Sequence, residues 1–371
     1  MPQPRIFAEW DLVTTYLPTC WEALADEYEQ VETKYGNAKI RTASDLLRMI
    51  LVHAACDLPL RETVALIAEA GGPDIAPMRL HKKMIRAVGY LRALVTKMVQ
   101  DLPDVAPEQW AGYDVVVVDA TTASRPGSLG ADVRVHTLMR LSNLEFVDVQ
   151  VTNTKIGETF AHFPLEFGQL VIGDRGYCYA SSIFGAAARG ADVLVRLNRG
   201  ATPLHDADSD ELVDVLGAMR ALDGHAVVER AVVLRWTDPL HMSRYLHGRL
   251  ILQRLPEAEA AKARKRVRDE LGSDVTAESI EAAGYVALFT TVDKSRLSAA
   301  RCMHLYRLRW QIELLFKRLK SICGLDRVPN YRPDTIKSWI YAKLLVALLI
   351  DRIASSTGEV FPPKLHEIAA A

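Results

Sequence analysis

The chain has 371 residues, of which 49% are hydrophobic and 25% are charged, and its formal net charge is −1. These values are ordinary for a folded protein of two or three domains, and they exclude a polycation. The five cysteines lie far apart without a CxxC pair, so we expect neither a zinc site nor a disulfide framework, and we do expect a reducing cytoplasm.

Residues 1–105 are predicted to be helical throughout. Segments 42–56 and 78–102 carry apolar residues at helical spacing, and a shorter amphipathic stretch at 58–71 lies between them. Several short helices joined by turns can contain a helix-turn-helix, although any small helical bundle has the same pattern. A DNA-binding role for this region therefore depends on the residues that follow it.

A mixed α/β region begins at residue 114. The run DVVVVD is typical of a strand buried on both faces, and segments 132–141 and 145–153 predict an antiparallel hairpin. The order of the elements predicts a mixed sheet. The next elements expected are a helical stretch near 157–163, a strand at 169–174, a helix at 181–191 and a strand at 192–198.

Residues 200–284 break this order and are predicted to be mostly β, with one charged helix. A strand at 285–292 then returns, and a long helix is expected from Leu297 to about Cys323, ending at Gly324. A final helix is predicted at 334–355. Its apolar run WIYAKLLVALLI is short and contains a lysine, and the N-terminal sequence has no signal pattern, so we expect no membrane segment.

Two aspartates follow apolar strands directly. Asp119 comes after VVVV and Asp174 after LVIG, where the crevice of an open α/β sheet lies. Aspartate often simply terminates a strand, and for either residue alone that alternative stays open. A carboxylate beside a core is costly without a partner such as a cation, which favours a metal site. Asp114, Asp132 and Asp192 begin strands instead and are interpreted as caps.

The long helix carries one narrow polar stripe. At about 100° per residue, an aromatic, three basic residues and one carboxylate fall on the same side of it. A solvated salt-bridge ladder is the alternative, but it does not explain the aromatic residue. The stripe consists of Tyr306, Arg309, Glu313, Lys317 and Lys320.

Positive charge is concentrated around this helix. Residues 296–343 contain eleven Lys and Arg against three acidic residues, a net charge of +8 on an otherwise acidic chain. Such a block indicates a local polyanion site or, equally well, a solvated helix face. Three carboxylates from two strand ends and one helix suffice to hold two Mg²⁺ ions about 3.5–4 Å apart, which activate an attacking water or 3′-hydroxyl. Arg309 and Lys320 would then hold the DNA backbone beside them.

These residues together resemble the DDE transposases of bacterial insertion sequences, in the subgroup with a Tyr-Arg-Glu-Lys (YREK) signature. DAT at Asp119 and DRG at Asp174 match the family's first two catalytic motifs. The spacing of the signature is Y-x2-R-x3-E-x6-K, and it is satisfied by Tyr306, Arg309, Glu313 and Lys320.

The resemblance implies a ribonuclease H-like mixed α/β fold with a mostly β insertion, preceded by a helical N-terminal domain. It implies that Asp119, Asp174 and Glu313 are catalytic and bind two Mg²⁺ ions, for which Mn²⁺ can substitute. The domains expected are 1–105 for binding DNA ends, 106–199 for the first part of the core, 200–284 for the insertion, and 285–371 for the rest of the core and the C-terminal helices.

By the same resemblance Tyr306, Arg309 and Lys320 contact transposon-end DNA near a distorted or flipped base, and we place Lys317 with them. Trp236 is a candidate for stacking on that base, with packing in a strand as the alternative. The implied activity is cleavage at transposon ends and strand transfer into target DNA, by cut-and-paste with a hairpin intermediate. We expect double-stranded DNA as the partner, a homodimer in the synaptic complex, and a cytoplasmic, nucleoid-associated bacterial enzyme.

Two other functions remain as alternatives. A related nuclease, or a domesticated transposase without strand transfer, needs the same three carboxylates. A non-catalytic DNA-binding protein such as a repressor predicts that at least one of them is lost, and all three are present.

Overall fold

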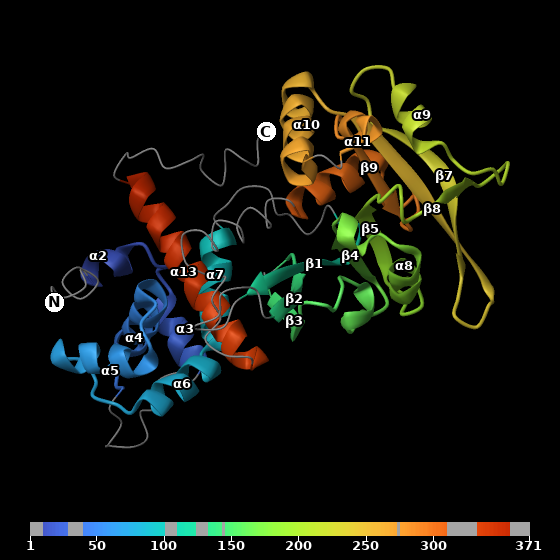
Figure 1. Cartoon of the computed structure of the whole chain (residues 1–371). Helices are drawn as coiled ribbons and strands as arrows, with labels where there is room; N and C mark the ends of the chain where they lie inside the picture. The colour runs from blue at the N-terminus through green and yellow to red at the C-terminus, as the bar shows by residue number, and fades with distance from the viewer. Residues whose placement is uncertain are drawn as a thin grey trace.

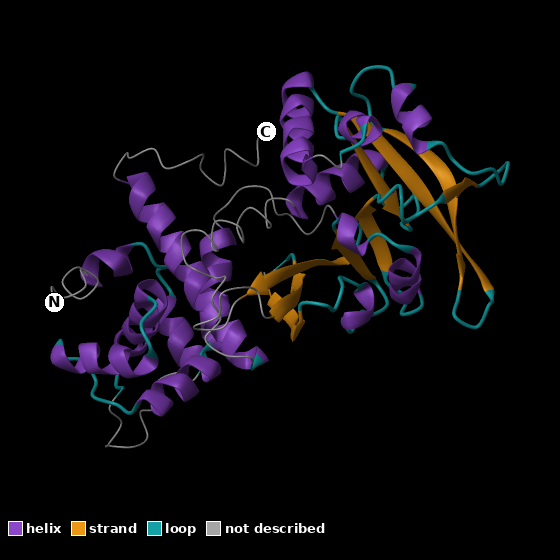
Figure 2. Cartoon of the chain, in the orientation of Figure 1, coloured by secondary structure: helices purple, strands orange, loops and turns teal. Residues whose placement is uncertain are grey.

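The computed structural model describes residues 10–28, 40–100, 110–123, 133–142, 145–272, 275–309 and 332–356. Helices from both ends of the chain gather on one side, and a long sheet with its own helices extends from them (Figures 1 and 2). Within these ranges no helix is both long enough and apolar enough to cross a membrane.

The predicted helices of the N-terminal region are present. Helix α4 begins with a capping box, in which Thr42 Oγ1 accepts from the Asp45 N–H at 3.0 Å and Asp45 Oδ2 accepts from the Thr42 N–H at 3.2 Å. Segment 78–102, analysed as one helical stretch, is divided into two helices at Ala87. The helices are α2 (Trp10–Thr15), α3 (Trp21–Glu27), α4 (Ala43–Cys56), α5 (Leu60–Glu69), α6 (Pro77–Arg86) and α7 (Val88–Gln100).

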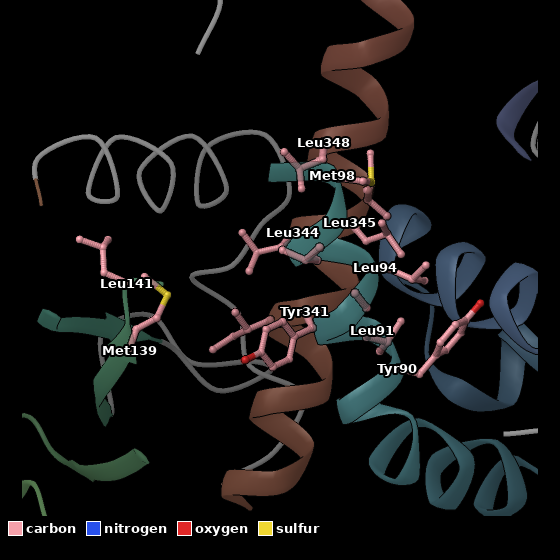
Figure 3. Close-up of a cluster of buried hydrophobic side chains, with 14 of the residues drawn as sticks. Tyr90, Leu91, Leu94, Met98, Met139, Leu141, Tyr341, Leu344, Leu345 and Leu348 are labelled. Carbon is pink, nitrogen blue, oxygen red and sulfur yellow. The ribbon is translucent and has the colours of Figure 1, made fainter. Parts of the chain in front are cut away.

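The C-terminal helix α13 (Pro333–Ser356) packs among these N-terminal helices. Its apolar face meets Leu91 and Leu94 of α7, and the end of a strand approaches it from the other side (Figure 3). Polar contacts add to this packing, because Arg352 donates to the carbonyls of Tyr16 at 3.1 Å and Met98 at 3.0 Å. The helical part is therefore built from both ends of the sequence.

The sheet is mixed, which confirms the predicted α/β class. In the described part of the chain, its nine strands have the order β3-β2-β1-β4-β5-β9-β8-β7-β6. Strands β1, β4 and β5 are parallel, and the predicted hairpin of β2 and β3 is antiparallel. This arrangement is consistent with a ribonuclease H-like core. The strands are β1 (Asp114–Ala123), β2 (Val133–Arg140), β3 (Glu145–Asn153), β4 (Gln169–Gly173), β5 (Asp192–Arg196), β6 (Leu204–Asp206), β7 (Val228–Thr237), β8 (Ser243–Arg254) and β9 (Tyr285–Thr290).

The segment 200–284 extends the same sheet. Strands β6, β7 and β8 join it through β9, with antiparallel pairing from β5 onward. Helices also belong to this half of the molecule, and residues 299–309 form one more. The helical elements are η2 (Phe160–His162), η3 (Arg175–Tyr177), α8 (Ala180–Ala187), α9 (Val215–Arg220), α10 (Glu257–Leu271) and α11 (Ala277–Ala282).

Each face of the sheet has its own core. Alternate residues of a strand point to opposite faces, so Val115 and Val117 join one cluster while Val116 and Val118 join the other. The first cluster, which we call the bundle-side core, is continuous with the N-terminal helices, with α13 and with residues 299–309. The second lies under α8 and α9.

An ion pair between a buried lysine and an exposed aspartate joins α13 to the end of α4. The Lys343 side chain is 1% exposed, and its ammonium donates to Asp57, whose side chain is 57% exposed. The same ammonium lies 4.7 Å from the centre of the Trp339 ring, and that ring packs edge-on against His53 at 5.1 Å. Burial lowers the pKa of His53 to about 4, and the Lys343 charge contributes.

We predict that Asp57→Asn destabilises the protein through Lys343. A buried pair broken on one side typically costs about 3–5 kcal/mol, and the exposure of Asp57 reduces this to roughly 2 kcal/mol. Asn tolerates the left-handed backbone of residue 57, where φ is 52°. Adding Lys343→Met should restore part of the loss, since no unpaired charge then remains buried. Urea unfolding followed by circular dichroism measures both, and equal stability of the single and double variants would contradict the assignment.

A second prediction concerns pH. The unfolded chain binds a proton at a histidine near pH 6.5, whereas folded His53 binds one only near pH 4. Between these values the unfolded state holds more protons, so stability falls as the pH falls through this window. His53→Asn should make the urea midpoint less dependent on pH from 7.5 to 5. Some dependence remains, because the pKa of buried His136 is also lowered to about 4. If the urea midpoint depends on pH equally in the two proteins, His53 does not contribute to the pH dependence of stability.

Candidate active site

Asp119 lies inside strand β1, not at its end as the sequence suggested, because β1 continues to Ala123 beside β2. Asp119 pairs with Thr137 of β2, whose hydroxyl donates to the Asp119 carbonyl at 3.2 Å. On its other edge β1 pairs with β4 only as far as Val117 and Ile172. Asp119 is therefore supported on one side by β2 and lies beyond the paired region on the other.

Asp174 follows β4 directly. It is two residues past Ile172, just as Asp119 is two residues past Val117, so the parallel register places them at the same level of adjacent strands. Neighbouring strands are about 4.8 Å apart, which is a spacing that one small cation site can bridge. The Asp174 carboxylate also begins η3, because its Oδ1 accepts from the Gly176 N–H at 2.8 Å.

The alternation of side chains decides which face the carboxylates occupy. Asp119 is an even number of residues from Val115 and Val117, so its side chain points to the same face of β1 as theirs. Both valines belong to the bundle-side core. Asp174 keeps the parity of Ile172 and has extended backbone. The helix at residues 299–309 contributes apolar side chains to this same core. The predicted third carboxylate, Glu313, follows this helix in the sequence and lies outside the described residues.

Arg249 of β8 attaches the beginning of this helix to the sheet. Its buried guanidinium donates to the carbonyls of Val292 and Leu297, both at 2.8 Å. It also pairs with Glu229 at 2.5 Å and reaches the Cys302 thiol at 3.6 Å. One side chain thus fixes the chain entering the helix, a role that no sequence motif indicated.

The predicted polar stripe is only partly within the described residues. Tyr306 and Arg309 are 8% and 4% exposed, and the Arg309 guanidinium lies 5.0 Å from the centre of the Tyr306 ring. The sequence placed these side chains on a surface for DNA, whereas here both are buried. Glu313, Lys317 and Lys320 lie outside the described ranges.

A group of arginines beside Asp174 was missed by the sequence argument. Arg175 is exposed and interacts electrostatically with Arg196 and Arg199, as well as with Asp174 and Tyr306. These arginines come from η3, β5 and the loop after β5, so only the fold brings them together. Their positive charge beside carboxylates is suited to a phosphate-containing substrate.

Tyr177 is a second feature that the sequence did not reveal. Its side chain is 1% exposed, and its hydroxyl has no hydrogen-bond partner in the part of the chain that the structure describes. Burial raises the pKa of this hydroxyl, and the nearby carboxylates of Glu158, Asp119 and Asp174 raise it further. Buried hydroxyls normally have partners, so an orphaned one among carboxylates fits a site that a bound group completes.

Trp236 lies away from these residues. It has the parity of Val232 and Leu234 in β7, and both belong to the core on the opposite face of the sheet from Asp119. Its ring packs against Phe184 of α8, with centroids 5.4 Å apart. This placement favours the packing alternative, and base stacking by Trp236 stays a prediction.

The carboxylates fit a divalent metal only in part. Asp119 and Asp174 offer hard oxygen ligands on adjacent strands, as Mg²⁺ requires. No three His, Cys, Asp or Glu side chains converge as a metal-binding group among the described residues. The predicted third ligand, Glu313, is not one of those residues.

Comparison with known proteins shows which family this chain is similar to. Residues 110–349 match the family described as the transposase DDE domain. Two proteins of Escherichia coli are each 31% identical to this chain over 91% of it and 93% of their own length: InsL of insertion sequence element IS186A, from strain K12, and the transposase for insertion sequence element IS421. The transposase for insertion sequence element IS231F of Bacillus thuringiensis subsp. israelensis is 25% identical over 60% of this chain and 51% of its own length.

The domain match spans more than half of the chain and includes both strand-end aspartates together with the helix beyond residue 299. With relatives of this identity along nine-tenths of its length, the chain belongs to the DDE transposases of insertion sequences.

Proposed function

We propose that Asp119, Asp174 and Glu313 are the catalytic carboxylates of this DDE transposase, an enzyme of a family that acts on DNA with divalent metal. The observation that supports this most is the shared register of Asp119 and Asp174 on the face of the sheet covered by residues 299–309. Glu313 is four residues beyond Arg309, the last described residue of that helix, and four residues make about one turn of an α-helix. A continuing helix would carry it along the same face.

In this proposal the carboxylates around the site bind metal ions, and the arginines bind DNA phosphates. Two bound Mg²⁺ ions, or Mn²⁺ in their place, would activate the attacking water or 3′-hydroxyl and stabilise the leaving oxygen. The carboxylates bind and orient these ions. Arg175, Arg196 and Arg199 hold the phosphates next to the scissile one, so that the strand stays in line for attack.

The YREK side chains complete the contact with transposon-end DNA. Lys320 and Lys317 hold backbone phosphates beside the metal site. Arg309 and Tyr306 are buried against each other, so in this proposal they position the helix and reach a distorted base only when DNA opens this region. Base stacking by Trp236 stays a prediction, and its packing against Phe184 on the opposite face favours the structural alternative.

The reaction we propose is end cleavage followed by strand transfer, by cut-and-paste with a hairpin intermediate. The helices before residue 105 bind the terminal repeats, the segment 200–284 is the insertion into a ribonuclease H-like core, and two copies act in the synaptic complex. Strand transfer separates a transposase from a nuclease with the same carboxylates. Joining of a cut end to a target plasmid, assayed with purified full-length protein, is therefore the deciding experiment.

We predict that Asp119→Asn, Asp174→Asn and Glu313→Gln each abolish cleavage of a duplex carrying the element's end. A metal ligand supplies several kcal/mol of transition-state stabilisation, so the rate should fall roughly a thousandfold or more. Circular dichroism and the melting temperature should show folded proteins. Near-normal cutting by any one variant would remove that residue from the catalytic set.

We also predict that Lys320→Ala lowers the affinity for end DNA and reduces the salt slope of binding by about one unit, as the loss of one phosphate contact requires. Arg309→Lys keeps the charge but loses the planar fork, so cleavage should fall while the salt slope changes little. Lys262→Ala on helix α10, within the insertion, serves as the control for a lost surface charge. Wild-type affinity and slope for Lys320→Ala would mean that this stripe is only a solvated helix face.

A further inference from the structure

Glu158 lies beside the Asp174 carboxylate, although no motif gave it a role. The two side chains meet at Gly176, where an added Cβ atom would overlap Oε2 of Glu158 and lie 3.1 Å from Oδ1 of Asp174. The Gly176 N–H donates to that same Oδ1. The backbone of Gly176 does not need positive φ, so space rather than conformation explains the glycine of the DRG motif.

The position of Glu158 is fixed by the elements around it. Its carbonyl accepts from the Tyr179 hydroxyl at 2.8 Å, at the start of α8. Two residues later, the Phe160 N–H donates to Ser182 Oγ at 2.9 Å, and the Phe160 ring stacks on Tyr177 with centroids 5.3 Å apart. Glu158 is thus held on a rigid connection between β3 and β4, as a preorganised ligand should be.

The Tyr177 hydroxyl provides an independent indication that something binds here. It is buried, has no hydrogen-bond partner among the described residues, and interacts electrostatically with Glu158, Asp119 and Asp174. A donor placed among carboxylates in this way can serve an oxygen atom that arrives with a bound group. Packing alone gives no reason for a hydroxyl at this position.

We propose that Glu158 is a fourth carboxylate of the metal site and that it binds one of the two divalent cations together with Asp174. This inference rests on the proposed function, which places Asp174 at the metal. Mg²⁺ is usually held by one or two carboxylates, with waters and substrate phosphates as its other ligands. The pair of Asp174 and Glu158 meets that requirement without a third protein ligand.

Binding of Mn²⁺ to the full-length protein without DNA tests this proposal directly. Free Mn²⁺ is measured by electron paramagnetic resonance during a titration. Glu158→Gln should weaken one binding site roughly tenfold or more, as does the loss of groups that support a metal site. Glu166→Gln is the matched control, because this exposed glutamate lies in the same connection between β3 and β4. It should bind Mn²⁺ like the unchanged protein, and Asp174→Asn should bind it at least as weakly as Glu158→Gln.

The outcomes separate the inference from the proposed function. If Asp174→Asn loses Mn²⁺ but a folded Glu158→Gln binds it normally, the role of Glu158 is wrong and the proposed function stands. If both bind Mn²⁺ normally, the metal site itself is wrong. If Glu158→Gln does not fold, Gly176→Ala replaces it, since the added methyl displaces the Glu158 carboxylate while keeping its charge. Normal Mn²⁺ affinity in that variant would equally overturn the role of Glu158.

Discussion

The parallel pairing of β1 with β4 is the constraint on which the candidate active site depends. The paired region ends at Val117 and Ile172. The next residues whose side chains point to the same face are therefore Asp119 and Asp174. Both therefore lie just beyond the paired region of β1 and β4 and on one face of the sheet. A shift of one residue in this register would turn one carboxylate toward the opposite core. Buried valines on both faces of β1 hold the register, so the apolar strand itself positions the proposed catalytic carboxylate of Asp119.

The same face of the sheet receives the helix that leads to Glu313. Arg249 ties the start of that helix to β8 and β9 through buried hydrogen bonds to Val292 and Leu297. Apolar packing then continues without interruption from this helix to α13 and the N-terminal bundle. Because one core joins them, a change that loosens the bundle is expected to reach the helix at residues 299–309.

The edge of the sheet beside Asp174 combines opposite charges within a short span. Arginines from η3, β5 and the following loop interact electrostatically with one another, and the carboxylates of Glu158 and Asp119 interact electrostatically with Tyr177. A phosphodiester and its metal ions present the complementary pattern, with negative phosphate oxygens next to divalent cations. Gly176 lets the carboxylates approach each other here, which explains physically why the residue after Arg175 has no side chain.

The sequence by itself determined the α/β class, the helices at both ends, and the two aspartates after apolar strands, because these depend on local periodicity and on short motifs. It placed the end of β1 wrongly, because pairing with β2 extends that strand beyond Asp119. The packing of α13 into the N-terminal bundle and the convergence of Glu158, Arg196 and Arg199 near Asp174 were decided only by the tertiary structure. These contacts bring together residues that are far apart in the chain. They depend on the order of the strands in the sheet, and no local sequence pattern predicts which strands become neighbours.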